Sequence, residues 1–291
     1  MIPAAFDYRS PASLEEALSL LREHGPDAKV LAGGQSLIPL MRFRLAEPGV
    51  IVDLRRCGEL TRLEETDEHL VIGSMVRHAT IETTGWLRER YPLLADAADV
   101  IADPLVRNRG TVGGSLVHAD PAGDWGAVML ACRAQLLVRG PGGDRTLPVD
   151  GFFLGPFTPA LEPEEILAET RLPKAGPGEG GAYEKLERKV GDFATVGVAA
   201  RVTLDEEGLC TGAGIGLTAV GPTNLRAPSA EEALVGGPPD EERITEASAA
   251  AAEDADPVAD NRGSEEYKRD MVRVLTARAL RRAVERAGGG E

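Results

Sequence analysis

The stretch Lys29–Met41, KVLAGGQSLIPLM, decides how the first part of the chain folds. Its residues 30–32 (VLA) predict a short buried strand. Gly33 and Gly34 then allow a tight turn that brings backbone N–H groups close to a ligand, because neither residue carries a Cβ atom. Ser36 can cap the apolar segment that follows. Such a cluster of N–H donors suits a phosphate or diphosphate, although a glycine turn without a ligand also fits this stretch taken alone.

A second glycine-rich stretch strengthens the ligand interpretation. Arg107–Asp124, RNRGTVGGSLVHADPAGD, again places two glycines, Gly113 and Gly114, between a β-branched residue and a hydroxyl residue, Ser115. Thr111 precedes the pair. Two separated glycine loops, each following a hydrophobic run, can hold the two sides of one diphosphate. The sequence therefore predicts that the two stretches together hold one diphosphate.

Composition limits the partners that the chain can have. The 291 residues are 43% hydrophobic and 27% charged, as in an ordinary folded protein, and carry a net charge of −15. This charge argues against nucleic acid or an anionic membrane, because both would repel the chain. No apolar run approaches the ~20 residues that span a bilayer, and the N-terminus does not resemble a signal peptide. We therefore expect a cytoplasmic protein.

The cysteines and histidines do not predict a metal site. Cys57, Cys132 and Cys210 lie far apart and form no C-x-x-C pair, which argues against an iron–sulfur cluster or zinc site built from this chain alone. His118 and Asp120 are close in sequence, but two ligands do not make a site.

Periodicity and capping signals divide the chain up to about residue 175 into two units. The first, up to about residue 55, contains a helix that begins at the capping box of Ser13 and Glu16 and ends at His24-Gly25. The remaining predicted elements are strands at 50–54, 70–72, 135–138, 146–149 and 170–172, and helices at 80–90, 92–102 and 125–134.

Residues 174–181, KAGPGEGG, predict a linker to a separate C-terminal domain. A β-hairpin at 195–204 and 209–220 follows, and then helices near 229–234, 240–253 and 264–287. Within the hairpin, 214–219 (GIGLTA) matches the loose dinucleotide pattern G-x-G-x-x-A. That pattern needs a helix to open inside it, whereas here the glycines lie in a strand that Pro222 follows. The strand interpretation therefore prevails.

Several ordered motifs together resemble the flavin-binding medium subunit of molybdenum hydroxylases, a family that includes carbon monoxide dehydrogenase and xanthine dehydrogenase. The resemblance covers nearly the whole chain. The motifs are AGGQSL (32–37), RNRGTVGGSL (107–116) with the following HADPAGD, YEKLERKVGDFA (183–194), GIGLTAVGPTNLRA (214–227) and SEEYKRDM (264–271).

The resemblance implies an α+β protein with two domains. Residues 1–175 would form a two-subdomain FAD-binding fold of the vanillyl-alcohol-oxidase (PCMH) type, with subdomains of about 1–55 and 56–175. Residues 180–288 would form the C-terminal domain of these flavoproteins, an antiparallel sheet with helices.

The resemblance also implies that the bound cofactor is FAD and indicates its contacts. The first loop and the second would hold the diphosphate from opposite sides, and the acidic position at 124 would contact the cofactor. Apolar residues would line it, and two residues of the YEKLERKVGDFA motif would reach the isoalloxazine ring. The implied FAD residues are Lys29, Val30, Leu31, Ala32, Gly33, Gly34, Gln35, Ser36, Leu37, Ile101, Ala102, Thr111, Gly113, Gly114, Ser115, Asp124, Ile166, Leu167, Lys185 and Phe193.

Simpler roles stand beside these. Asp124 can cap a helix that begins at Trp125, which does not conflict with a cofactor contact. Lys185 lies in a charged run, KLERK, that would ordinarily be a solvated strand edge, and Phe193 can belong to the core. Arg107 and Arg109 can neutralise phosphate, but pairing with some of the 47 acidic residues is favoured.

Two positions depart from the family pattern: Gln35 stands where His is frequent, and Ser115 where Asn is usual. Both replacements keep a hydrogen-bonding group. We therefore expect any difference from these relatives in the affinity for the flavin or in the flavin's reduction potential.

The implied function is that of the FAD subunit of a three-part oxidoreductase. A molybdenum-cofactor large subunit would hydroxylate the substrate, and a [2Fe-2S] small subunit would pass electrons to this FAD and onward to an external acceptor. The complete enzyme would be a dimer of heterotrimers. No residue of this chain is expected to act as a nucleophile or general base. A stand-alone flavin oxidase and a non-catalytic assembly subunit are the alternatives, but both glycine pairs are intact and histidines are scattered.

Overall fold

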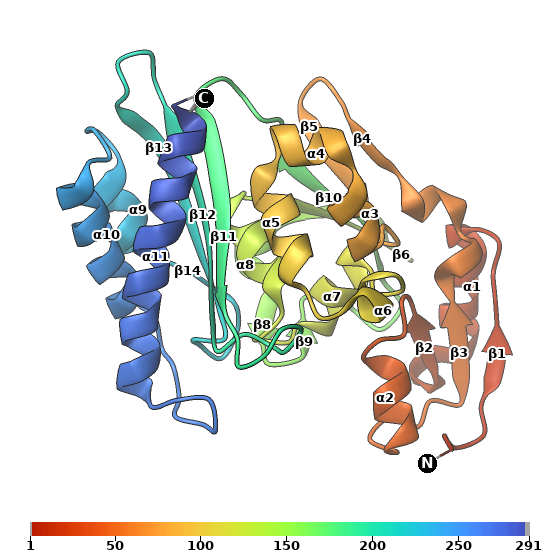
Figure 1. Ribbon diagram of the computed structural model, residues 1–291. Helices are drawn as coiled ribbons and strands as arrows, with labels where there is room; N and C mark the ends of the chain where they lie inside the picture. The colour runs from red at the N-terminus through yellow and green to blue at the C-terminus, as the bar shows by residue number, and fades with distance from the viewer. Residues whose placement is uncertain (1, 289–291) are drawn as a thin grey trace.

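Three helix-flanked β-sheets follow one another across the molecule in the computed structural model, which describes residues 2–288 (Figure 1). The N-terminal unit lies at one side, and the C-terminal helices lie at the opposite side. Buried hydrophobic clusters lie beside and between the sheets and join neighbouring units. The expected α+β class, with an antiparallel C-terminal sheet covered by helices, is confirmed.

The N-terminal unit is a parallel three-stranded sheet of order β1-β3-β2. Helix α1 begins where the Ser13 hydroxyl accepts the N–H of Glu16 and ends at Gly25, whose φ of 53° ends the helix, as predicted. The elements are β1 (Asp7–Arg9), α1 (Leu14–His24), β2 (Ala28–Leu31), α2 (Leu37–Arg42) and β3 (Val50–Asp53).

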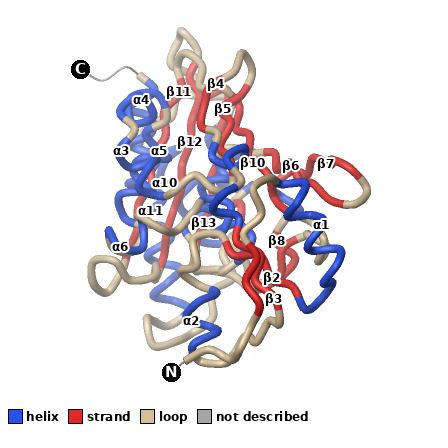
Figure 2. The backbone as a smooth tube through the Cα atoms, turned by 90° about the vertical axis from the view of Figure 1, so that its right-hand side faces the viewer, coloured by secondary structure: helices blue, strands red, loops and turns tan. Residues whose placement is uncertain are grey.

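The middle unit is built on an antiparallel sheet of order β4-β5-β10-β6-β7. In Figure 2 the hairpin of β6 and β7 projects from this unit next to α1, and α1, β3, β6 and β10 share one apolar cluster. The strands are β4 (Leu63–Glu65), β5 (His69–Gly73), β6 (Gln135–Gly140), β7 (Gly143–Pro148) and β10 (Ile166–Pro173), with a small ribbon of β8 (Phe153–Gly155) and β9 (Thr158–Pro159).

Helices cover this middle sheet, and one prediction for them is wrong. The helix expected at 80–90 is two helices that meet at Thr84, whose ψ of 103° is not helical. The hydroxyls of Thr83 and Thr84 donate to the carbonyls of Ala79 and Thr80, a local bond that favours a bend. The helices are α3 (His78–Thr83), α4 (Gly85–Arg90), α5 (Pro92–Val100), α6 (Pro104–Arg107), α7 (Val112–His118) and α8 (Asp124–Ala131).

The C-terminal sheet, of order β11-β12-β13-β14, is antiparallel throughout. The predicted linker is too long, because its residues 179–181 already belong to β11. A Cβ atom on Gly180 would lie 2.1 Å from the Ala283 carbonyl oxygen, so glycine serves close helix packing there. The elements are β11 (Glu179–Leu186), β12 (Val196–Leu204), β13 (Cys210–Thr218), β14 (Leu225–Arg226), α9 (Pro228–Leu234), α10 (Glu241–Asp254) and α11 (Glu265–Ala287).

Both faces of the C-terminal sheet are buried. Along β12, Val198 and Ala200 belong to the cluster under α10 and α11, whereas Ala199 belongs to the cluster of the middle unit. Gly214 and Gly216, the glycines of the dinucleotide-like pattern, lie in β13, and a Cβ on either would come within 2.0 Å of a carbonyl oxygen of α8. These glycines allow α8 to pack on the sheet, so the strand interpretation of this stretch is confirmed.

No helix within residues 2–288 combines the length and apolar character needed to cross a bilayer.

Candidate functional site

The first glycine segment connects β2 to α2 and leaves a row of donors unused. Gly34 has a φ of 77°, which glycine adopts without strain. Within residues 2–288, the five backbone N–H groups from Gly33 to Leu37 donate no hydrogen bond to the protein. Ser36 occupies the N-cap position of α2, but its side chain makes no capping bond, so that expectation is wrong. The segment therefore offers successive N–H donors to an anionic ligand.

The two glycine segments touch each other directly. A Cβ atom on Gly33 would lie 2.3 Å from the Arg109 carbonyl oxygen and 2.7 Å from Cα of Gly110. On the other side, a Cβ on Gly114 would lie 3.3 Å from that of Ala32. Glycine is therefore required at position 33, because any side chain there would push the segments apart.

The second glycine pair lies in the first turn of α7 and not in a loop, which corrects the prediction. The Thr111 hydroxyl caps this helix and accepts the N–H of Gly114 at 3.0 Å. The N–H groups of Val112 and Gly113 donate to the carbonyls of Val76 and Ser74. These donors already have protein partners, so the second segment supports the first, and its own cofactor contact stays a prediction.

A segment that sequence reasoning missed, residues 74–78, supports the second glycine pair. A Cβ on Gly113 would lie 2.2 Å from that of Ser74, and the N–H of His78 donates to the Gly110 carbonyl. Nδ1 of the buried His78 accepts a hydrogen bond of 2.9 Å from Nε1 of Trp125. Burial, and secondarily the nearby Arg107, lowers the pKa of His78 to about 4.

We expect His78 to make stability depend on pH. An unfolded chain protonates this histidine below pH ~6.5, whereas the folded protein protonates it only near a pKa of about 4. The contribution of His78 to the free energy of unfolding is therefore fully present above pH ~6.5. It falls by about 3 kcal/mol as the pH drops from ~6.5 to below the folded pKa of about 4. Urea unfolding of the wild type and of His78→Asn, which keeps an acceptor for Trp125, should show a shallower pH dependence in the variant. Equal slopes would contradict this role.

Asp124 and Lys185 form a buried ion pair between α8 and β11. Asp124 is the first residue of α8, and its carboxylate accepts from the Tyr183 hydroxyl at 2.7 Å and from Lys185 Nζ at 3.1 Å. The N-cap is Gly123, so the capping alternative for Asp124 is wrong. The Lys185 side chain is only 2% exposed, which excludes the solvated strand edge.

The surroundings of the Asp124 carboxyl group have opposing effects on its pKa. Burial raises the pKa of Asp124, and the Lys185 ammonium and the Tyr183 hydroxyl oppose that rise. Lys185 Nζ also donates to the Val100 carbonyl at 2.9 Å and lies 3.7 Å from Glu187 Oε2, a buried oxygen with no hydrogen-bond partner within residues 2–288. Lys185 thus ties the end of α5 to α8 and β11.

The turn at Ile101 and Ala102 is held from inside the protein. Ala102 has a φ of 48°, unusual for a residue with a Cβ atom. Arg107 Nη1 donates to both carbonyls, at 3.0 and 3.1 Å, while its guanidinium pairs with Glu82 at 2.8 Å. The pairing predicted for Arg107 is confirmed. Arg109 forms no ion pair with any residue from 2 to 288, so the pairing predicted for Arg109 is wrong.

The remaining predicted residues lie in different surroundings. Ile166 and Leu167 are buried on β10 in separate clusters, Ile166 towards the N-terminal unit and Leu167 towards the middle unit. Both side chains pack in the hydrophobic core, and their contact with the cofactor stays a prediction. Phe193 is 54% exposed in the loop between β11 and β12, so its alternative as a core residue is wrong.

Residues of the C-terminal domain that sequence reasoning missed complete this site. Asn224 Nδ2 donates to the Gly123 carbonyl at 2.9 Å and so fixes the start of α8. Tyr183 could have been found, because it precedes Lys185 by two residues and a strand directs both side chains to one face. For Asn224 no pattern in the sequence gives its contact.

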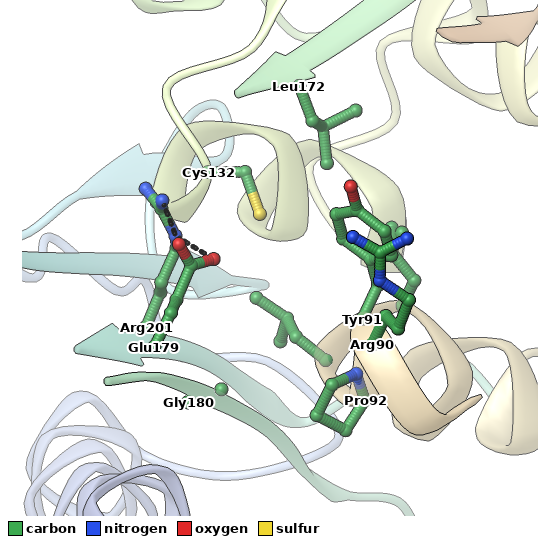
Figure 3. Close-up of a pocket in the computed structure, with 11 residues that line it drawn as sticks. Arg90, Tyr91, Pro92, Cys132, Leu172, Glu179, Gly180 and Arg201 are labelled. Carbon is green, nitrogen blue, oxygen red and sulfur yellow. Dashed lines mark hydrogen bonds and ion pairs between the residues drawn. The ribbon is translucent and has the colours of Figure 1, made fainter. Parts of the chain in front are cut away.

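A small cavity elsewhere does not belong to this site. It has a volume of about 30 Å³, room for water but not for a cofactor, and lies between α5 and the start of β11 (Figure 3). Cys132 faces it, and burial raises the pKa of that thiol to about 12. Nearby, Arg201 and Glu179 form a bidentate ion pair of 2.6 and 2.7 Å. The thiol therefore stays protonated and unreactive.

Comparison with known proteins places the chain in a family. The family described as FAD binding domain in molybdopterin dehydrogenase matches residues 4–175, and the CO dehydrogenase flavoprotein C-terminal domain matches residues 181–283. The carbon monoxide dehydrogenase medium chain of Hydrogenophaga pseudoflava is 42% identical over 97% of this chain and 98% of its own length. The 6-hydroxypseudooxynicotine dehydrogenase complex subunit alpha of Paenarthrobacter nicotinovorans is 38% identical over 99% and 97%.

Solved structures agree with this placement. A chain of reconstituted CO dehydrogenase from Oligotropha carboxidovorans superposes with a TM-score of 0.95 at 40% identity, covering 98% of this chain and 100% of that chain. A chain of quinoline 2-oxidoreductase from Pseudomonas putida 86 gives a TM-score of 0.91 at 34% identity, with 99% of both chains covered. The chain therefore belongs to the family of FAD-binding flavoprotein subunits of molybdopterin-dependent dehydrogenases.

Proposed function

We propose that this chain is the FAD-carrying electron-transfer subunit of a cytoplasmic molybdenum hydroxylase. A large subunit with the molybdenum cofactor and a small subunit with [2Fe-2S] centres would be its partners, assembled as a dimer of heterotrimers. Electrons from the iron–sulfur centres would leave the complex through this subunit to an external acceptor. The names of its relatives, which are medium chains and subunits of complexes, support a multi-subunit enzyme.

The row of unused donors at Gly33 to Leu37 carries this proposal. Successive N–H groups that point to no protein acceptor fit the two phosphates of FAD, and the contact of Gly33 with residues 109–110 holds their spacing. We assign Lys29–Leu37 to one side of the diphosphate and Thr111 with Gly113–Ser115 to the other. The glycines and the unbonded backbone N–H groups of the first segment fit the diphosphate of FAD.

The other proposed contacts surround the rest of the cofactor. We assign a polar contact to Asp124 and contacts along the cofactor to Ile101, Ala102, Ile166 and Leu167. Lys185 and Phe193 would lie nearest the ring. FAD, when bound, supplies the ability to accept and release electrons one or two at a time, whereas the protein contributes binding, orientation and exclusion of water. None of these side chains needs to exchange a proton with a substrate.

The substrate of the complex is not decided by this chain. The relative named for carbon monoxide and the relative named for 6-hydroxypseudooxynicotine have 42% and 38% identity to it, respectively. Such similar flavin subunits in enzymes named for such different compounds support a substrate pocket on another chain.

Rapid-mixing kinetics on the assembled complex tests the proposed function. The complex, with and without FAD, is reduced with dithionite and mixed with dichlorophenolindophenol, and the iron–sulfur absorbance is followed. We expect rapid reoxidation with FAD and reoxidation at least tenfold slower without it. Equal rates would show that electrons leave by another route and would contradict the role of this subunit.

A further inference from the structure

The loop that carries Phe193 is an exposed excursion between β11 and β12. The Thr195 N–H donates to the Leu186 carbonyl at 2.7 Å and closes its base. Two apolar side chains project from it, since Val190 is 95% exposed and Phe193 is 54% exposed. An exposed apolar loop with a closed base needs additional contacts to hold one position.

One such contact joins the loop to the turn that the proposed function places beside the cofactor. Gly191 has a φ of 85°, and a Cβ atom on it would lie 3.0 Å from the carbonyl oxygen of Ala102. The same carbonyl accepts from Arg107. The loop therefore rests on a fixed part of the middle unit, and a displacement of the loop would separate it from the turn at 101–102.

Arg262 fastens the loop from the opposite side. Its Nη1 donates to the Phe193 carbonyl at 2.7 Å, and its Nη2 contacts Asp192 Oδ1 at 3.2 Å. The same carboxylate accepts the N–H of Phe193 at 2.8 Å and pairs with Arg188 at 3.2 Å. Of these contacts, the hydrogen bond to Arg262 is the main cause that lowers the pKa of Asp192. The backbone N–H and carbonyl of Phe193 are thus fixed by one carboxylate and one guanidinium.

Arg262 is itself held by the long C-terminal helix. Its N–H donates to Asp260 Oδ1 at 2.8 Å, and the other oxygen of Asp260 pairs with Lys268 Nζ at 2.9 Å. Lys268, in the first turns of α11, is 2% exposed and also donates to the Val258 carbonyl. A continuous series of polar contacts therefore runs from α11 to the loop.

We propose that Arg262 is a positioning residue that holds Phe193 at the flavin ring and so controls how small acceptors reach the reduced flavin. The proposal rests on the proposed function and adds a residue from the C-terminal domain to it. The guanidinium matters because it bonds the Phe193 carbonyl and the Asp192 carboxylate at the same time, which an ammonium group can do only in part.

The first test needs no cofactor. Limited trypsin digestion at Arg188 and Lys189, followed by mass spectrometry, reports how often the loop opens. We expect cleavage roughly tenfold faster in Arg262→Gln than in wild type, since a charge-assisted hydrogen bond is lost. Arg262→Lys should lie between the two. Arg273→Gln, which removes an exposed arginine of α11 that pairs only with Asp270 among residues 2–288, should cleave like wild type.

The second test uses the chain loaded with FAD. In Arg262→Gln, the fluorescence of bound FAD should change, and oxygen should reoxidise the dithionite-reduced flavin several-fold faster than in wild type. Arg262→Lys should restore part of the wild-type behaviour. If Arg262→Gln melts like Arg273→Gln yet leaves both cleavage and reoxidation unchanged, the role of Arg262 is refuted. If wild type binds no FAD even with its partner subunits, the proposed function fails instead. The cleavage result alone then decides whether Arg262 holds the loop, and unchanged cleavage refutes its positioning role.

Discussion

Replacing Gly33 with valine should weaken FAD binding by about 10- to 100-fold. The new Cβ would lie 2.3 Å from the Arg109 carbonyl oxygen, which belongs to backbone and cannot turn away as a side chain would. The two glycine segments must separate, and overpacking of this kind costs about 1–3 kcal/mol. The distortion falls on the row of N–H donors that the diphosphate needs. Titration of the apoprotein with FAD, followed by flavin fluorescence, gives the two dissociation constants.

Gly142→Val is the matched control for this substitution. Gly142 lies in the turn between β6 and β7, where an added Cβ meets no atom within 4 Å. The Gly142→Val variant carries the same added side chain as Gly33→Val, and it should bind FAD as tightly as the wild type. A Gly33→Val protein that is folded and binds FAD as tightly as this control would contradict the assignment of the first glycine segment.

Replacing Asp124 with asparagine should lower the free energy of unfolding by about 3–5 kcal/mol. The substitution keeps the size of the side chain but leaves the Lys185 ammonium, 2% exposed, without the carboxylate at 3.1 Å. Removing one partner of a buried ion pair has a cost of this size, and Glu187 Oε2, 3.7 Å from Lys185 Nζ, is too far to replace the lost hydrogen bond. Lys185→Met should cost less, because Asp124 still accepts the Tyr183 hydroxyl and can bind a proton in its buried surroundings.

Chemical denaturation of both single variants and the double variant measures this pair. The double variant should be more stable than Asp124→Asn alone, which is the signature of a coupled pair. Glu241→Gln, which breaks the exposed pair between Glu241 and Arg281, should cost less than about 1 kcal/mol. An Asp124→Asn cost as small as that of Glu241→Gln would show that the buried pair is not required for folding.

The sequence could predict those parts of the fold in which local chemistry and packing agree. The helix cap at Ser13, the hairpin across residues 205–208 and the three C-terminal helices all carry such signals, and the structure has each of them, although the Glu16 carboxylate accepts the N–H of Ala12 and not that of Ser13. The predictions failed where tertiary packing overrides composition. Gly180, within the predicted linker, belongs to β11 because the chain there pairs with β12, and α11 packs closely against it. The pair Gly113–Gly114 opens a helix because Thr111 caps it.

The candidate site shows the same division. Each of the two glycine segments could be singled out, since each carries its signal in adjacent residues, whereas their direct contact could not be predicted. The surroundings of Lys185 could not, because its partner Asp124 lies 61 positions away and its burial depends on how α8 packs against β11. The support from Asn224 and Arg262 likewise comes from the C-terminal domain over large sequence separations. Such contacts exist only once the domains are packed together.

The absorption spectrum of the purified chain, titrated with FAD and then reduced with dithionite, tests the central claim most directly. The account predicts one equivalent of bound flavin with bands near ~370 and ~450 nm that bleach on reduction. Where the isolated chain stays colourless, the same spectrum is recorded after the large and small subunits are added. A fully assembled complex that still binds no FAD would contradict the account.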